Sequence, residues 1–158
     1  MANTQSMCTS FLSELMTATH NFGTAPTRGT GAADTFKAAL YVATGTYNAS
    51  TTAYSATNEV SGAGYSAGGV TVTNATPPAN VNTSTTAGVG YWTPSASIVY
   101  TGVTLTTPFD AMLMYNSTQS NKAVAVFTFG SQTITSGNFT LTMPSNTTST
   151  ALLRLSTT

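Results

Sequence analysis

Apolar and polar positions alternate most regularly in residues 109–130. Residues 109–116 read FDAMLMYN and residues 122–130 read KAVAVFTFG, and both alternating faces of each run are largely apolar. A period of two that is rich in β-branched and aromatic residues predicts β-strands, and two apolar faces predict strands covered on both sides. The polar residues STQSN between the runs suit a hairpin loop. This segment is therefore predicted to be a central antiparallel hairpin.

The same alternation recurs in shorter segments, of which residues 98–105 form either a pair of strands or one strand with a β-bulge at Gly102. Residues 79–90 carry a weaker pattern that suits an edge strand. Together these segments predict an all-β fold, a single jelly-roll-like β-sandwich of about seven or eight antiparallel strands. The shorter segments are residues 34–43, 70–76, 98–105, 138–143 and 151–155.

Helical spacing occurs near the N-terminus, where Ser10 is a suitable capping residue and His20 lies close to the end of the pattern. A histidine there would face the C-terminal end of the helix dipole. We expect an N-terminal arm with a short helix in residues 1–22 and a single β-sandwich domain in residues 23–158. The apolar residues at helical spacing are Phe11, Leu12, Leu15 and Met16.

The composition narrows the classes of protein that fit. The chain has 158 residues, of which 41% are hydrophobic and only 5% are charged, whereas an ordinary domain has about 25% charged residues. The hydrophobic fraction is sufficient for a core. Nucleic-acid binding needs many clustered lysines and arginines, so we expect no nucleic-acid partner. A neutral surface rich in threonine suits a subunit of an assembly better than a lone soluble monomer.

Targeting and redox signals are also weak. The first residues, MANTQSMCTS, contain neither the basic nor the long apolar region of a signal peptide. No apolar run approaches the roughly 18 residues that a membrane helix needs. Cys8 is the only cysteine, so no intrachain disulfide can form. We expect synthesis in a cytoplasm and no membrane partner.

Residues that perform chemistry are scarce. The single His20 and the single Cys8 do not form a metal-binding motif, so we expect neither a metal nor a cofactor. Hydrolases need a nucleophile, a base and an orienting group, and glycosidases need a pair of carboxylates, but no spacing marks either set. No glycine-rich loop stands between a strand and a helix. The sequence therefore predicts no catalytic residues and no enzyme.

The few charged residues allow two interpretations. They are either solvated groups at the ends of strands or a small number of salt bridges that set the register between subunits. The residues concerned are Asp34, Glu59, Arg28, Lys37, Lys122 and Arg154.

Aromatic residues supply the candidate interface. Residues 44–69 have little periodicity but contain three spaced tyrosines, which indicate that the segment packs onto the domain. Tyrosine and tryptophan often anchor interfaces, although ordinary core packing is the alternative for Trp92. With the helix included, the candidate interface residues are Phe11, Leu15, His20, Tyr47, Tyr54, Tyr65 and Trp92.

Four segments together resemble a family of small proteins encoded among the virion structural genes of tailed bacteriophages. They agree in order and spacing and cover most of the chain, while the polar segment 79–97 departs from the pattern as an insertion. The segments are HNF at 20–22, DTFKAALY at 34–41, TTAY followed by NEVSGAGYSAGG within 51–69, and NKAVAVFTFG at 121–130.

The resemblance implies a capsid cement, or decoration, protein that binds the major capsid protein on the outside of the shell. We expect a homo-oligomer, a trimer or a dimer, that is made in the host cytoplasm and located on the virion exterior. The alternative is a host-recognition module of a tail or head fibre, in which exposed tyrosines or Trp92 stack on a surface glycan. A tail-tube or adaptor sandwich is a third possibility.

Overall fold

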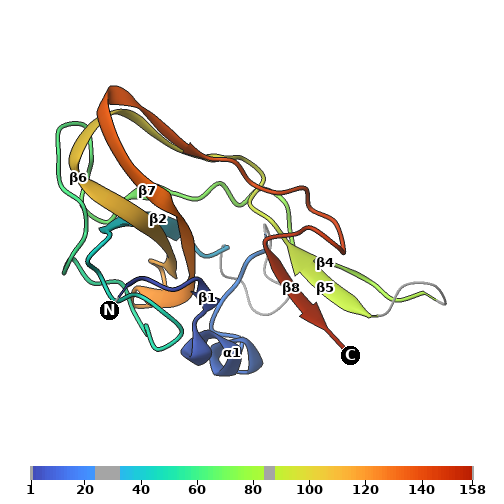
Figure 1. The fold of residues 1–158 in the computed structure, drawn as a ribbon. Helices are drawn as coiled ribbons and strands as arrows, with labels where there is room; N and C mark the ends of the chain where they lie inside the picture. Colours follow the sequence, from blue (N-terminus) through green and yellow to red (C-terminus); the bar gives the residue numbers. More distant parts are fainter. Residues whose placement is uncertain (1, 24–32, 84–87, 158) are drawn as a thin grey trace.

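A computed structural model of the chain describes residues 2–23, 33–83 and 88–157. These residues form one helix and eight strands, and every strand pairing is antiparallel (Figure 1). The predicted all-β class with a short N-terminal helix is thereby confirmed, whereas the jelly-roll connectivity stays a prediction. The elements are β1 (Ser6–Met7), α1 (Thr9–Met16), β2 (Phe36–Val42), β3 (Val70–Thr71), β4 (Ala79–Val81), β5 (Val89–Trp92), β6 (Ile98–Asn116), β7 (Lys122–Leu141) and β8 (Leu153–Ser156).

The strands form two sheets. The larger has the order β1-β7-β6-β2-β3, and the smaller has the order β4-β5-β8. In Figure 1 the larger sheet lies on the left and the smaller on the right, with α1 below them. The chain therefore enters the larger sheet at one edge through β1 and ends in the smaller sheet.

The central hairpin is longer than the sequence predicts. β6 has 19 residues and β7 has 20, so the separate strands predicted on either side of Pro108 and before Asn138 are each one continuous strand. Pro108 is tolerated because the register shifts on both sides of it, and proline is found in sheets at such irregularities. Gly102 has a φ of 63° and lies between the shifted pairs of Tyr100 and Val103, which confirms the predicted bulge.

Both faces of the larger sheet are covered, as the two apolar faces of the hairpin predict. On one face Phe22 stacks on Phe36 of β2 with 4.3 Å between ring centroids. On the other face the segment 44–69 packs its tyrosines on the sheet, and Tyr54 stacks on Tyr115 of β6 at 4.7 Å. The most continuous part of the core is thus residues 109–116 of β6 with residues 123–126 of β7, and the first half of β6 adds Ile98, Tyr100, Val103 and Leu105.

Sheet pairing sets the start of the helix. Cys8 occupies the N-cap position of α1 and its side chain makes no capping hydrogen bond, so the predicted Ser10 cap is wrong. The Cys8 N–H instead donates to the Val124 carbonyl at 3.0 Å, which continues the pairing of β1 with β7. The helix begins where that pairing ends, because the chain must turn away from the sheet there.

Candidate functional site

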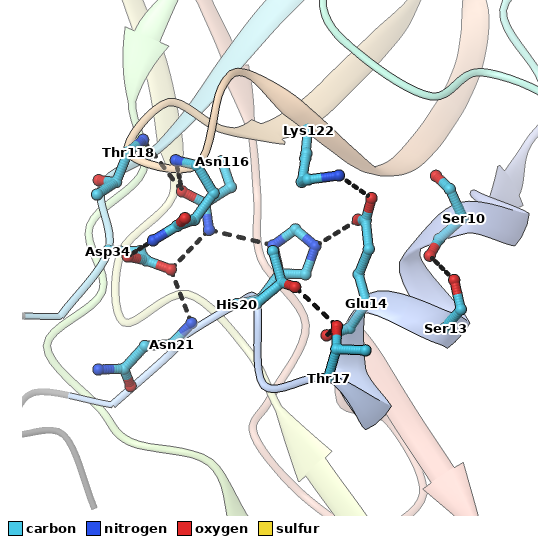
Figure 2. Close-up of polar contacts among 12 residues, drawn as sticks. Ser10, Ser13, Glu14, Thr17, His20, Asn21, Asp34, Asn116, Thr118 and Lys122 are labelled. Atoms are coloured by element: carbon cyan, nitrogen blue, oxygen red, sulfur yellow. Dashed lines mark hydrogen bonds and ion pairs between the residues drawn. The ribbon is translucent and has the colours of Figure 1, made fainter. Parts of the chain in front are cut away.

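A buried polar network joins the N-terminal segment to the central hairpin (Figure 2). Glu14 of α1 lies 2.7 Å from His20 Nε2 through Oε2 and accepts a hydrogen bond from Lys122 Nζ at 2.6 Å through Oε1. On the other side of the ring, Asn116 Nδ2 lies 3.1 Å from His20 Nδ1 and 2.7 Å from Asp34 Oδ2. Three charged side chains and the only histidine of the chain therefore meet in one place.

The pattern of donors and acceptors assigns the proton of His20. Asn116 Oδ1 accepts from the backbone N–H groups of Thr118 and Gln119, both at 3.1 Å. The Asn116 amide nitrogen must then donate to Asp34 and to His20. His20 Nδ1 is therefore an acceptor, and the ring is neutral with its proton on Nε2, from which it donates to Glu14.

Asp34 anchors the other end of the network. It is 7% exposed, and its carboxylate also accepts from the Asn21 backbone N–H at 2.8 Å. The Asp34 N–H in turn donates to the Asn21 carbonyl at 3.1 Å. These bonds fasten the residues after the helix to the residues before β2.

Glu14 is held in its charged form. Burial of its carboxyl group opposes ionisation, but hydrogen bonds from Lys122 and His20 outweigh burial and keep the pKa of Glu14 below its ordinary value. The charged carboxylate is what allows one residue to bind both a lysine and a histidine N–H.

His20 does not lie where the sequence predicts. The helix ends at Met16, and His20 follows it, buried against the Phe11 ring at 4.9 Å. The interpretation of the charged residues as solvated strand ends also fails for Asp34, which is buried and partnered within the chain. Lys122 does lie at the start of a strand with a partly exposed side chain, which pairs with Glu14 of the same chain. Arg28 lies outside the described residues.

A second polar cluster surrounds Glu59 in the segment 44–69. Its carboxylate accepts from the hydroxyls of Tyr54 and Tyr65 and from the Gly68 N–H, each at 2.7 Å. Burial, together with the neighbouring Glu59 carboxylate, raises the pKa of both tyrosine hydroxyls. Tyr65 also accepts from the Leu40 N–H at 3.0 Å, which fixes the cluster to β2.

The remaining tyrosine of this segment also bonds within the chain. The Tyr47 hydroxyl donates to the Thr57 carbonyl at 2.6 Å, and its ring lies 3.7 Å from the Tyr41 ring. The prediction that the segment packs down is confirmed. The hydroxyls, however, bond to the protein itself rather than projecting from its surface.

Most predicted interface residues have an internal role. Trp92 is 3% exposed, packs on Phe22 at 4.7 Å and donates to the Thr76 carbonyl at 2.9 Å, which is the core-packing alternative. All aromatic residues of the chain fall within the described ranges, and none of their side chains is exposed. Of the seven predicted interface residues, Phe11, His20, Tyr47 and Trp92 are buried, and Leu15, Tyr54 and Tyr65 are half-buried.

An apolar groove of about 150 Å³ lies between α1 and the smaller sheet. Leu155 of β8 lines it and is 50% exposed, and Met16 at the end of α1 is 83% exposed. The structure thus brings three of the predicted interface residues together at one groove. The lining residues are Met7, Phe11, Leu15, Phe22, Pro78, Ala79, Gly90, Tyr91, Trp92, Leu153 and Leu155.

Neither His20 nor Cys8 is presented for chemistry. Both ring nitrogens of His20 are occupied by Glu14 and Asn116. Cys8 is fully buried, and burial, with the Glu14 carboxylate nearby, raises the pKa of its thiol to about 11. Among the described residues, no group of three or more His, Cys, Asp or Glu is placed to hold a metal ion. In that same part of the chain, no helix has the length and apolar character needed to cross a membrane.

Sequence reasoning did not single out Glu14 or Asn116 as site residues. One signal could have found the network, because three of the four sequence segments singled out above meet in it. They contribute His20, Asp34 and Lys122, which the structure places within one chain of contacts. No protein-family model, no curated protein and no solved structure matches this chain.

Proposed function

We propose that this chain is a structural subunit of a tailed-bacteriophage virion, a cement protein that binds the major capsid protein on the outside of the shell. One observation supports this most: the chain uses its scarce charges and its aromatic rings to hold itself together. The surface that remains consists largely of hydroxyl, amide and backbone groups. Such a surface is suited to permanent contact with other subunits rather than to turnover of a substrate.

A contact surface, or footprint, made of such groups can bind the capsid without removing charged side chains from water. Desolvating a charged pair costs several kcal/mol per ion, often more than the pair returns, whereas hydroxyl and backbone groups exchange water for protein hydrogen bonds at little net cost. The apolar part of the footprint is the groove with its exposed neighbours Leu12, Met16 and Leu155. Many weak contacts per subunit become strong when several copies bind one lattice.

Three of the four segments that resemble phage proteins contribute side chains to the polar network. His20 and Asp34 are both buried, and Lys122 reaches Glu14 from the start of β7. The resemblance therefore concerns how the fold is held together. The contact with the capsid is assigned to the exposed apolar residues of α1 and β8.

The alternative, a glycan-binding module, has less support. Sugars bind proteins by stacking on exposed aromatic rings, and Tyr47 and Trp92 are each below 10% exposed (9% and 3%). Tyr54 and Tyr65 are half-buried and bonded to Glu59. No specific observation favours a fibre tip over a shell component.

The proposal is tested by adding the purified protein to capsid shells of the encoding phage from which it is absent. We expect saturable binding and a higher melting temperature of the shells. The double variant Leu12→Ser/Met16→Ser should bind more weakly, and Thr107→Ser, at an exposed position of β6 outside the proposed footprint, should bind as the wild type does. Absence of binding to shells, or binding to isolated tails alone, would overturn the proposal.

A further inference from the structure

We propose that the outer edge of β7, from residue 128 to residue 141, pairs antiparallel with the same edge of a second copy of this chain about a two-fold axis. The larger sheet would then continue across two subunits. The inference names an interface for the homo-oligomer but does not rest on the capsid role, because self-pairing is a property of the isolated chain.

The edge is open along the distal half of β7. β1 pairs with β7 only at Val126 and Ala125. Beyond Val126, no described residue pairs with that side of the strand, while β6 follows its other side as far as Leu141. In an antiparallel ladder, alternate residues direct their N–H and C=O groups away from the partner. β7 accordingly forms the outer rim of the bent hairpin in Figure 1.

The opposite edge of the same hairpin is covered. The Thr104 N–H of β6 donates to the Ala63 carbonyl at 2.8 Å. Gly62 and Gly64 lie against the backbone of β6. A Cβ on Gly62 would lie 1.9 Å from the Thr104 carbonyl oxygen, and a Cβ on Gly64 would lie 2.4 Å from the Gly102 carbonyl oxygen. The fold thus protects the edge of β6 with a glycine-rich loop and gives the edge of β7 no equivalent cover among the described residues.

The edge also lacks the charges that prevent pairing. Natural sheets protect exposed edges with charged side chains, above all lysine. Residues 123–153 contain no Asp, Glu, Lys or Arg. A second copy of this strand therefore meets no like charge, and its threonines can form favourable cross-strand pairs. This absence of repulsion is why we assign the edge to a second copy.

Bulges in β7 limit where a second copy could pair with it regularly. β7 has additional residues between the partners of Ala111 and Phe109 and between those of Leu105 and Val103. Ser136, in the second irregularity, has a φ of 48°. β7 itself has no additional residue in the stretch 137–141, where the irregularity at Gly102 belongs to β6. We therefore place the two-fold axis there and expect the stretch 131–134 to contribute less.

The test is the mass of the isolated protein measured by analytical ultracentrifugation over a range of concentrations. We expect twice the chain mass of 16.2 kDa for the wild type. Thr133→Lys/Thr140→Lys places one lysine in each stretch at exposed positions and should give the monomer mass. Thr52→Lys/Thr57→Lys adds the same charge at exposed positions of the tyrosine segment and should remain dimeric.

Hydrogen exchange gives an independent measurement on the wild type. Amides of residues 137–141 should become more protected as the protein concentration rises. A wild type that is monomeric throughout, or a trimer, contradicts a two-fold edge. The proposal is also overturned if Thr133→Lys/Thr140→Lys remains dimeric and keeps the circular dichroism of the wild type. The contact between copies would then lie elsewhere, for example at the groove beside α1. Failure to bind shells would leave these results unaffected.

Discussion

His20 binds an acidic side chain and an amide through its two ring nitrogens, and the His20 ring itself is buried. Each partner has further bonds, since Glu14 also holds Lys122 and Asn116 also holds Asp34. The residue therefore connects the helix, the strand β6 and the segment before β2. Removing one buried member of such a network leaves its partners without hydrogen bonds, which costs more than the bond itself contributes.

We expect His20→Phe to lower the free energy of unfolding by about 2–4 kcal/mol, because Glu14 and Asn116 each lose a buried partner. Phenylalanine keeps the contact with the Phe11 ring, so the loss reports the hydrogen bonds rather than a cavity. Denaturant unfolding measures it, with Thr17→Val at an exposed position of the same segment as the control. A loss equal to that of the control would show that the network does not stabilise the fold.

Gly69 is required by both space and backbone conformation. Its φ is 70°, and a Cβ there would lie 1.6 Å from the Ala38 carbonyl oxygen. Gly69→Ala should therefore destabilise the protein by at least about 2 kcal/mol. At Gly90 a Cβ would meet nothing within 4 Å, so Gly90→Ala should change stability by less than about 1 kcal/mol. Equal thermal shifts in the two variants would contradict this account of Gly69.

At the scale of elements, α1 depends on its neighbours. A helix of eight residues is too short to be stable alone. It is held at its start by the pairing of β1 with β7 and, through Glu14, by Lys122 and His20. The helix is accordingly expected to be stable only while these contacts are made.

This dependence should vary with pH. The folded-state pKa of Glu14 is lowered from 4.5, so its contribution is fully present above pH 4.5 and is lost as the pH falls through the folded value. Glu14→Gln and Lys122→Met should each reduce the loss of unfolding free energy on acidification relative to the wild type. Urea unfolding from neutral pH downward measures the difference, and parallel curves for all three proteins would refute the role of Glu14.

The elements show where sequence reasoning succeeds and where it does not. Alternation predicts the central hairpin and the Gly102 bulge, because both depend on local pattern. Alternation wrongly predicts a break in β6 at Pro108 and in β7 before Asn138. The register shifts that accommodate these residues depend on the partner strand, which the local pattern does not show. Ser10 fails as a cap for a related reason, since the start of α1 depends on pairing with β7.

The candidate site was harder to predict. Tyrosines and a tryptophan are equally suited to a core and to an interface, and composition cannot distinguish the two. The structure places Tyr47 and Trp92 in the core because segments distant in sequence supply their partners. Asn116 ends a strand and carries no local signal, although it contacts both His20 and Asp34.

At the scale of the whole molecule, the chain combines a core in which most aromatic side chains are buried with an exterior of zero formal net charge and an open distal edge on β7. Its net charge is zero, so neither attraction to nucleic acid nor mutual repulsion between copies is expected. The proposed β7 edge and the groove at α1 involve different residues.

A cryo-electron microscopy reconstruction of the intact virion tests the central claim most directly. The account predicts ordered copies of this fold on the outer face of the capsid shell, with α1 and β8 toward the major capsid protein. A shell without this fold, or copies found only at the tips of tail fibres, would contradict it.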